Sequence, residues 1–352
     1  MTSTQPPADR KSFRVAIVCA LPREADAIIL LFDQFWDEDP GRAGGDMNTY
    51  ITGRIGKHHI VLVLLPNMGS GAAAAATSSL RSSYTNLTLA ILVGICGGVP
   101  RIAGSDTFLG DVVVSKTVIQ YRYGRQYDEH FAVKNTIDDN LGRANKDIRS
   151  LLAMLETEYM RRQLQKETYG HLRHLQEAAK KEQRQASYLY PGSKEDKLYS
   201  PTYAHRHREA CGVCANDADV FCEPASKASC VEVGCDPANL VVRNRSEDLV
   251  RGADFKPKIF IGRIGSGDAV MKSGKNRDRI AMEHDLVAFE MEGAGAWDEV
   301  PCIVVKGICD YADSHKNKDW NDFAAATAAS VAKAILGRYT AHDVDRDATR
   351  TE

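Results

Sequence analysis

Acidic side chains follow three short apolar runs of this sequence, at the points where buried strands would end. Glu24 comes shortly after FRVAIVCAL, Glu290 and Glu292 follow LVAF, and Asp310 and Asp313 follow CIVVKGIC. A carboxylate at such a position costs free energy unless it is paired or used in chemistry. A helix cap or a surface charge explains any single one. Carboxylates after three strands favour one shared site that transfers protons or holds hydroxyl groups.

The runs that carry these residues alternate with helical patterns. Val- and Ile-rich runs predict buried strands, and alanine-rich or amphipathic runs predict helices. The alternation predicts an α/β layer fold with a largely buried mixed sheet, in which ligands collect at the carboxyl ends of the strands. The expected core strands lie within 13–21, 48–56, 58–66, 87–98, 107–121, 258–270, 286–297 and 302–313, and the expected core helices are 23–35, 69–84 and 320–339.

A charged and irregular segment separates the two halves of this pattern. Residues 143–185 have the spacing of one or two amphipathic helices, and the stretch after them is polar and contains Pro and Cys. We interpret 139–256 as an insertion into one domain that covers 13–340. Polar tails are expected at 1–12 and 341–352.

Composition excludes several classes of protein. The chain has 352 residues, 43% hydrophobic residues and a formal net charge of −2, which are ordinary values for a globular protein. A disordered chain would have less apolar content, and a nucleic-acid binder would usually be more basic. No apolar run is long enough to span a membrane, and the N-terminus has no apolar signal core. We therefore expect a cytoplasmic location, with neither nucleic acid nor membrane as a partner.

Five of the nine cysteines crowd into one polar stretch, and their odd number in a chain of this kind argues against a disulfide framework. Cys211 and Cys214 have the Cys-x2-Cys spacing of a zinc-ligand pair, but no second pair with that spacing follows. A structural metal and free thiols both remain open. The remaining members of this group are Cys222, Cys230, Cys235, His205 and His207.

Several motifs, taken in order, resemble the nucleoside phosphorylase superfamily of purine and uridine phosphorylases and related nucleosidases. AFEMEGAGAW resembles the ribose-binding signature of that family, and IGSGDAVM and GICDYAD resemble its base-holding and catalytic segments. VCALPREADAI and LPNMGSGAAAAAT match as well, and GICDYADSHKNKDW is similar to fungal members. The resemblance covers roughly 13–135 and 257–340. It implies a three-layer α/β sandwich around a central mixed β-sheet, working as a homodimer or larger homo-oligomer.

The resemblance also implies cleavage of an N-glycosidic bond through an oxocarbenium-like ribosyl transition state, with no metal or cofactor. Asp310 takes the role of the acid that protonates the leaving purine, and burial behind Ile308 and Cys309 is expected to keep its proton in place. Asp313 is expected to support this region or to cap a helix. Glu292 and Met291 match the ribose grip.

The base side of the site is matched less completely. Asp268 and Val270 lie in the base-holding segment, but Val270 replaces an aromatic residue of adenine-specific nucleosidases, so part of the base platform has to come from elsewhere. Trp320 stands where those enzymes carry an aromatic near the base. Its ring would stack on a purine, although ordinary packing at a helix start explains it equally well.

The nucleophile decides between phosphorolysis and hydrolysis. Phosphorylases of this family carry an arginine and a hydroxyl residue where this chain has Leu92 and Ile95, and apolar side chains cannot coordinate a phosphate dianion. Glu24 matches the glutamate with which methylthioadenosine and adenosylhomocysteine nucleosidases activate water. A first-turn helix charge is the alternative explanation for Glu24. The apolar residues Leu92 and Ile95 and the carboxylate of Glu24 all favour water as the nucleophile.

The expected substrate is an adenine nucleotide or nucleoside, with ATP favoured. Some superfamily members in antiviral or self/non-self defence resemble this chain and remove adenine from ATP. Arg122, Arg125 and Lys272 are the candidate phosphate-binding residues, although solvated surface charge explains them equally well. The alternatives are a phosphate-dependent purine nucleoside phosphorylase, a methylthioadenosine-type nucleosidase and a non-catalytic nucleotide sensor.

Overall fold

The fold is a mixed α/β sandwich, as the sequence pattern predicts. The computed structural model describes residues 5–38, 40–128, 131–134, 136–209, 211–214, 220–243, 250–251 and 254–341. Most of the expected C-terminal tail, from 342 onward, and the first four residues of the N-terminal tail lie outside these ranges. Within the N-terminal tail, Arg10–Ser12 forms a 3-10 turn capped by the Asp9 side chain.

A nine-stranded mixed sheet forms the centre of the molecule, in the order β14-β13-β8-β15-β5-β1-β4-β3-β2. Its inner strands are apolar and almost fully buried, as expected for strands covered on both faces. The strands are β1 (Val15–Cys19), β2 (Gln34–Phe35), β3 (Tyr50–Ile55), β4 (His58–Leu64), β5 (Leu89–Gly98), β8 (Val112–Gln120), β13 (Ile259–Ser266), β14 (Leu286–Glu290) and β15 (Cys302–Asp310).

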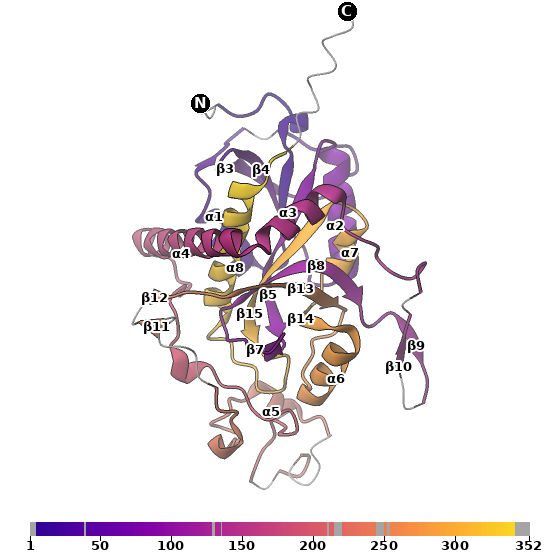
Figure 1. Ribbon diagram of the computed structural model, residues 1–352, viewed down its shortest axis with the longest axis vertical. Coiled ribbons are helices and arrows are strands. Elements are labelled where there is room, and N and C mark those ends of the chain that lie inside the picture. The colour runs from indigo at the N-terminus through magenta and orange to yellow at the C-terminus, as the bar shows by residue number, and fades with distance from the viewer. Residues whose placement is uncertain are drawn as a thin grey trace, which may run out of the picture.

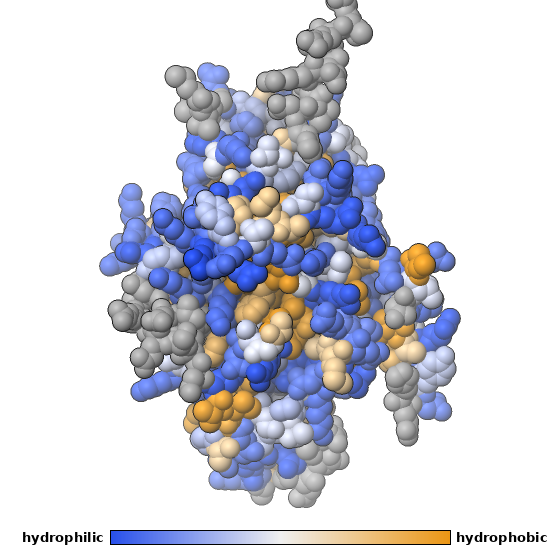
Figure 2. Space-filling model, in the orientation of Figure 1, coloured by the Kyte–Doolittle hydropathy of each residue, from blue (hydrophilic) through white to orange (hydrophobic). Residues whose placement is uncertain are grey.

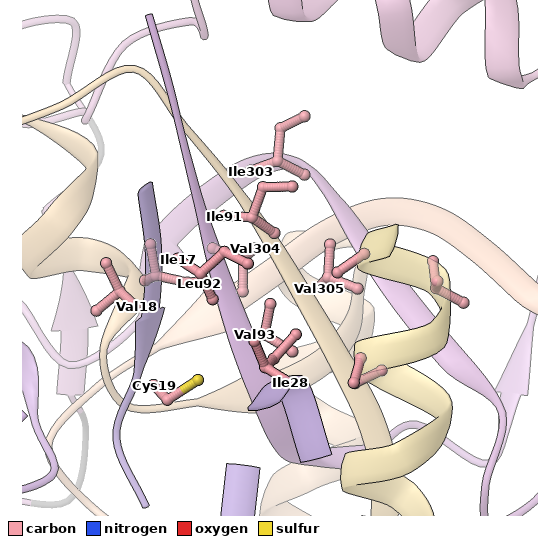
Figure 3. Packing of buried hydrophobic residues seen from close by; sticks show 14 of the residues in the cluster. Ile17, Val18, Cys19, Ile28, Ile91, Leu92, Val93, Ile303, Val304 and Val305 are labelled. Carbon is pink, nitrogen blue, oxygen red and sulfur yellow. The ribbon is translucent and has the colours of Figure 1, made fainter. Parts of the chain in front are cut away.

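Helices cover both faces of this sheet (Figure 1). On β15, Gly307 faces Ala324 of α8 and Val304 faces Gly293 at the start of α7, and residues of opposite parity point to opposite faces. Figure 3 shows the core between β1, β5, β15 and α1, filled by branched aliphatic side chains. The helices are α1 (Pro22–Ile29), α2 (Ser70–Ser83), α6 (Gly274–His284), α7 (Gly293–Trp297) and α8 (Asn321–Arg338).

The expected helix over 23–35 is wrong in its second half. α1 ends at Ile29, and the chain then turns into β2, which pairs with β3. The Asp33 backbone N–H donates to the Arg54 carbonyl oxygen at 2.8 Å, and the Asp33 carboxylate binds Lys333 Nζ at 2.7 Å. These tertiary bonds override the local helical spacing.

The expected insertion contributes helices that lie against the core and an irregular segment at one end. α3 (Lys146–Leu155) leads into α4 (Glu158–Lys181), which packs against α8. The segment around α5 (Glu223–Lys227) lies at the lower end of the molecule in Figure 1. The remaining strands are short: β6 (Arg101–Ile102), β7 (Ser105–Asp106), β9 (Gly124–Gln126), β10 (Phe131–Val133), β11 (Val250–Arg251) and β12 (Asp254–Phe255).

The face of the molecule in Figure 2 is largely hydrophilic, with an apolar area near its centre. Among the described residues, no helix combines the length and the apolar character needed to cross a membrane.

Candidate active site

A cavity of about 160 Å³ lies where β5, β14 and β15 end. β14 pairs with β5 through Ala288–Gly98 and Phe289–Gly97, and β15 pairs with β5 on the other edge. This pairing brings together segments that are about 200 residues apart in the sequence, as the acidic pattern predicts. The lining includes Glu24, Glu290, Met291, Glu292, Asp310 and Lys316.

Glu24, in the first turn of α1, is only 2% exposed and is fixed by three backbone donors. Its Oε2 accepts hydrogen bonds from the N–H groups of Ala20 and Leu21, both at 2.9 Å, and its Oε1 accepts one from Ile95 N–H at 2.8 Å. The carboxylate fits only because residue 94 is glycine. A Cβ on Gly94 would lie 2.3 Å from Glu24 Oε1.

Burial raises the pKa of Glu24 above its ordinary value. The Lys306 ammonium opposes this shift, the Glu292 carboxylate adds to it, and the hydrogen bonds from Ile95 and Leu21 oppose it. A carboxyl with a raised pKa is a better proton acceptor when ionised, because the proton it takes up is held more tightly. The position therefore suits a general base.

Glu292 is held by a buried lysine that the sequence analysis did not single out. Lys306 Nζ donates to Glu292 Oε2 at 3.0 Å, and the Gly69 N–H donates to Oε1 at 3.3 Å. Burial opposes the charged form of Lys306, but Glu292, Glu24 and Glu290 together raise its pKa. The Lys306 ammonium therefore stays charged and stabilises the neighbouring carboxylates of Glu292, Glu24 and Glu290.

Glu290 supports the turn that presents Glu292. Its two carboxylate oxygens accept hydrogen bonds from the N–H groups of Glu292 and Gly293 at 2.8–3.0 Å. Burial raises the pKa of Glu290, and Lys306 opposes the shift. Since its oxygens are used by the backbone, Glu290 positions the Met291–Glu292 segment.

Asp310 is less buried than the sequence analysis expects. Its side chain is 12% exposed, and Lys316 Nζ donates to Asp310 Oδ2 at 2.9 Å. The Ala312 N–H donates to Oδ1 at 2.8 Å. Besides the expected neighbours Ile308 and Cys309, an ammonium therefore stands beside the Asp310 carboxylate, and this pair faces the cavity.

Burial alone would lower the pKa of Lys316, but the Asp310 carboxylate raises it above the ordinary value. Asp313 lies behind this pair. Its Oδ1 accepts a hydrogen bond from His315 N–H at 2.8 Å, and Arg277 Nη1 is 3.9 Å from its Oδ2. Asp313 thus fixes the loop that carries Lys316, and it does not cap α8, whose N-cap is Trp320.

The remaining lining is apolar. Val270 and Met291, two of the predicted site residues, line the cavity together with Met68 and Phe289. Phe289 is an aromatic side chain that the sequence analysis did not select, and Tyr121 packs edge-on against it at 5.3 Å between ring centroids. It supplies an aromatic surface where residue 270 carries none.

Two residues predicted to bind the base do not line the cavity. Trp320 is fully buried, its Nε1 donates to the Glu195 carbonyl oxygen at 3.0 Å, and its ring packs against Phe323. Asp268 instead binds the start of α2, where its Oδ1 accepts from Ser70 N–H at 2.7 Å. Trp320 is a packing residue, which is the alternative left open above. Asp268 lies outside the cavity lining and holds the start of α2.

The predicted phosphate-binding residues lie outside the cavity lining. Arg122 and Lys272 are exposed beside it: Arg122 packs alongside Gly267, and Lys272 follows the lining residue Met271. Arg125 lies on β9, in the β9–β10 hairpin that projects from the body in Figure 1.

Comparison with known sequences points to one family. Residues 14–169 match the family model described as the phosphorylase superfamily. A nucleotide-binding leucine-rich repeat (NLR)-like protein of Hyaloscypha variabilis is 30% identical over 348 residues, which are 96% of this chain and 31% of that protein. A 5′-methylthioadenosine/S-adenosylhomocysteine nucleosidase of Mycobacterium bovis is 31% identical over 90 residues, 24% of this chain and 35% of that protein. The chain spans about a third of the length of these curated relatives.

Solved structures share the fold. The futalosine hydrolase of Helicobacter pylori superimposes with a TM-score of 0.53 at 17% identity, covering 93% of this chain and 99% of that one. A 5′-methylthioadenosine/S-adenosylhomocysteine nucleosidase of Streptococcus pneumoniae gives 0.51 at 18% identity, with 92% and 98% covered. These solved structures have the same fold as this chain, and its residues 14–169 match the phosphorylase superfamily model.

Proposed function

We propose that this protein is a purine N-ribosyl hydrolase that releases adenine from adenine nucleosides and nucleotides. The observation that carries the proposal is the pairing of charges in the cavity. The lining contains four carboxyl groups, of Glu24, Glu290, Glu292 and Asp310, and one ammonium, of Lys316, which is already paired. A phosphate dianion would meet repulsion there, whereas water accepts and donates hydrogen bonds to carboxylates.

The start of α2 supports the same choice. A helix N-terminus offers free N–H groups to an anion, but here carboxylates occupy the first ones. Gly69 N–H donates to Glu292, and Ser70 N–H donates to Asp268. The glycine-rich turn before α2 therefore holds the protein's own carboxylates.

The two proposed catalytic carboxyls contact β5 three residues apart, Glu24 next to Gly94 and Asp310 next to Gly97. Both carboxyls line the same cavity, so a ribosyl group bound there can have the base on one side and water on the other, as in inverting glycoside hydrolysis.

The proposed reaction gives one proton to the leaving base and takes one proton from the attacking water. The Asp310–Lys316 pair delivers a proton to the purine as the bond between C1′ and the base nitrogen breaks and its electrons leave with the base. Glu292 and the Met291 backbone hold the ribose hydroxyls as the ring flattens. Glu24 takes a proton from water, whose oxygen bonds to C1′. The products are free adenine and a ribose that keeps its 5′ group.

Adenine release without phosphate is the decisive measurement. We expect the purified protein to release adenine, detected by chromatography, from ATP, AMP, adenosine or methylthioadenosine in phosphate-free buffer, at a rate that added phosphate does not raise. Strict dependence on phosphate would assign a phosphorylase instead. Absence of free base from every one of these compounds would leave a nucleotide sensor.

Displacing the Glu24 carboxylate without changing it is a second test. Gly94→Ala places a methyl group where Glu24 Oε1 lies, and a displacement of about 1 Å in a catalytic group costs on the order of a hundredfold in rate. We expect that loss in turnover. Gly71→Ala is the matched control, because a Cβ there meets nothing within 4 Å. Full activity of Gly94→Ala would remove the geometric argument for Glu24.

We propose a preference for ATP because exposed cations lie beside the cavity. Arg122 and Lys272 are placed to meet phosphates that extend from it, so we expect Arg122→Ala with Lys272→Ala to raise KM for ATP roughly three- to tenfold, with KM for adenosine unchanged. Arg279→Ala, on the exposed side of α6, is the control. Equal effects on both substrates would contradict a phosphate role.

One observation favours a second substrate. Met68 and Val270 line the cavity and are 51% and 50% exposed. Such an apolar rim suits the 5′-methylthio group of 5′-methylthioadenosine, a compound in the name of the mycobacterial relative. A higher kcat/KM for methylthioadenosine than for ATP would select this alternative.

Kinship with the NLR-like protein supports a setting in self/non-self defence, and we expect a homodimer or larger homo-oligomer.

A further inference from the structure

A second group of reactive side chains lies outside the cavity, in the irregular segment around α5. His207, Cys211, Cys214 and Cys222 each offer one ligand atom, and these four atoms all lie within 4.8 Å of one another. His207 Nδ1 is 3.4 Å from Cys214 Sγ and 3.8 Å from Cys222 Sγ. The Cys-x2-Cys pair thus finds its partners in a histidine before it and a cysteine after it.

We propose that these four residues bind a structural Zn²⁺ ion. A tetrahedral zinc with Zn–S near 2.3 Å and Zn–N near 2.0–2.1 Å separates its ligand atoms by about 3.5–3.8 Å, which matches the distances from His207. Hydrogen bonds alone explain the arrangement poorly. The lone pair of one imidazole nitrogen accepts one proton, yet two sulfur atoms approach His207 Nδ1. One cation at the centre satisfies all four ligands.

The packing of this segment supports the proposal independently. Its buried cluster consists of small side chains, and only one of them, Val233, is a branched aliphatic. So little apolar area cannot hold a segment whose only α-helix among the described residues is α5, of five residues. Metal ions stabilise small segments of this kind. The cluster contains Cys214, Cys222, Ala225 and Val233, packed by Cys211, Ala228 and Cys235.

From a different set of observations we propose a second zinc site next to the first. His205 Nδ1 lies 3.6 Å from Cys230 Sγ and 3.5 Å from Cys235 Sγ. Its other ring nitrogen, Nε2, lies 3.0 Å from the carbonyl oxygens of both Ala225 and Ala228. Carbonyls only accept, so Nε2 carries the proton and the Nδ1 lone pair faces the two sulfurs. Metal-binding histidines are oriented in this way.

His315 completes this second set from the loop between β15 and α8. Its side chain is 2% exposed, and neither ring nitrogen has a hydrogen-bond partner among the described residues. Its ligand atom lies within 4.8 Å of those of His205 and Cys235, while its ring stacks on Tyr199 at 4.1 Å. A buried unpaired imidazole nitrogen is costly, and a metal bond to it removes that cost.

The second site ties the irregular segment to the candidate active site. His315 follows Ser314, whose Oγ accepts a hydrogen bond from His205 N–H at 3.0 Å, and precedes Lys316, which pairs with Asp310. A Zn²⁺ ion shared by His205, Cys235 and His315, with Cys230 Sγ 3.6 Å from His205 Nδ1 as a further ligand, therefore fixes the loop that carries Lys316. This consequence rests on the proposed function, whereas the metal sites do not.

The test measures metal in the full-length protein, independently of activity. Protein purified under reducing conditions is expected to contain one zinc ion per site by elemental mass spectrometry. Replacing zinc with Co²⁺ is expected to give the visible absorption of tetrahedral cobalt–thiolate. Cys211→Ser with Cys214→Ser is expected to lose one ion, and Cys230→Ser with Cys235→Ser the other. Cys302→Ser, in the buried strand β15, is the control and keeps both.

The outcomes separate the two sites. An ion lost only in the Cys211/Cys214 variant supports the first site and overturns the second, and the reverse result does the opposite. Unmodified protein that holds no zinc and gives no cobalt spectrum overturns both, even if the variants do not fold. Disulfides between these cysteines, detected as an intact mass lower by two hydrogens per pair, overturn both as well. Zinc present in a protein without adenine release leaves the sites standing and removes only the catalytic consequence.

Discussion

We expect Asp310→Asn to lower turnover by at least about a hundredfold, the usual contribution of a general acid. The substitution keeps the shape of the side chain and its acceptor for the Ala312 N–H. It removes the carboxyl group from the proposed proton-donating pair and leaves the Lys316 ammonium without its carboxylate partner. Without a proton at the purine, the base leaves as an anion, and the bond to C1′ breaks more slowly.

The measurement is kcat for adenine release, with circular dichroism and a thermal melt to establish that the variant is folded. Asp319→Asn is the matched control, because Asp319 lies in the same loop between β15 and α8 but does not line the cavity. Turnover of Asp310→Asn equal to that of the unmodified protein would show that another group protonates the base.

Glu24→Gln is expected to reduce turnover by a similar factor, about a hundredfold or more. Glutamine cannot accept the proton of water. Its amide nitrogen also faces backbone donors, because the N–H groups of Ala20, Leu21 and Ile95 all point at this carboxylate. The loss therefore has two causes, the missing general base and the disturbed hydrogen bonds from the backbone. Gly94→Ala separates these causes, because it moves the carboxylate but keeps it.

The pH profile of kcat distinguishes a general base at Glu24 from a residue that only supports the structure. Because burial raises the pKa of Glu24 above 4.5, its active, ionised form is lost as the pH falls through that raised value. The acid limb of kcat is expected above pH 4.5 in the unmodified protein and absent in Glu24→Gln. Glu283→Gln, on exposed α6, should keep the limb. An unchanged profile in Glu24→Gln would assign the limb to another group.

Raised pKa values also affect folding in a definite direction. A carboxyl whose folded-state pKa is raised favours the folded protein when protonated, and that contribution is lost as the pH rises through the folded-state value. For Glu24 and Glu290 this loss is offset by Lys306, which is held charged between them. The buried lysine is thus what allows several carboxyls to share one wall.

The core elements and the carboxylates at their ends could be predicted from the sequence. Apolar runs of the length of one strand, each ending in an acidic residue, leave few other arrangements, since parallel strands in one sheet bring their carboxyl ends to the same edge. Lys306 carries a signal of the same kind, because it is a lone cation within the apolar run CIVVKGIC. A buried lysine needs carboxylate partners, so its position in that run indicates an ion pair inside the core.

Other features depend on contacts between distant parts of the chain. Local spacing does not contain the neighbours on which three of these features depend. They are the pairing of Lys316 with Asp310, the burial of Trp320 in the core and the end of α1 at Ile29. The proposed zinc ligands show the same limit, because His315 lies 80 residues beyond Cys235. Residue type and periodicity fix which groups are buried and which strands end in carboxylates, since those follow from local solvation. Which groups meet is decided by the register of β5 with β14 and β15, because side-chain partners are set by tertiary packing.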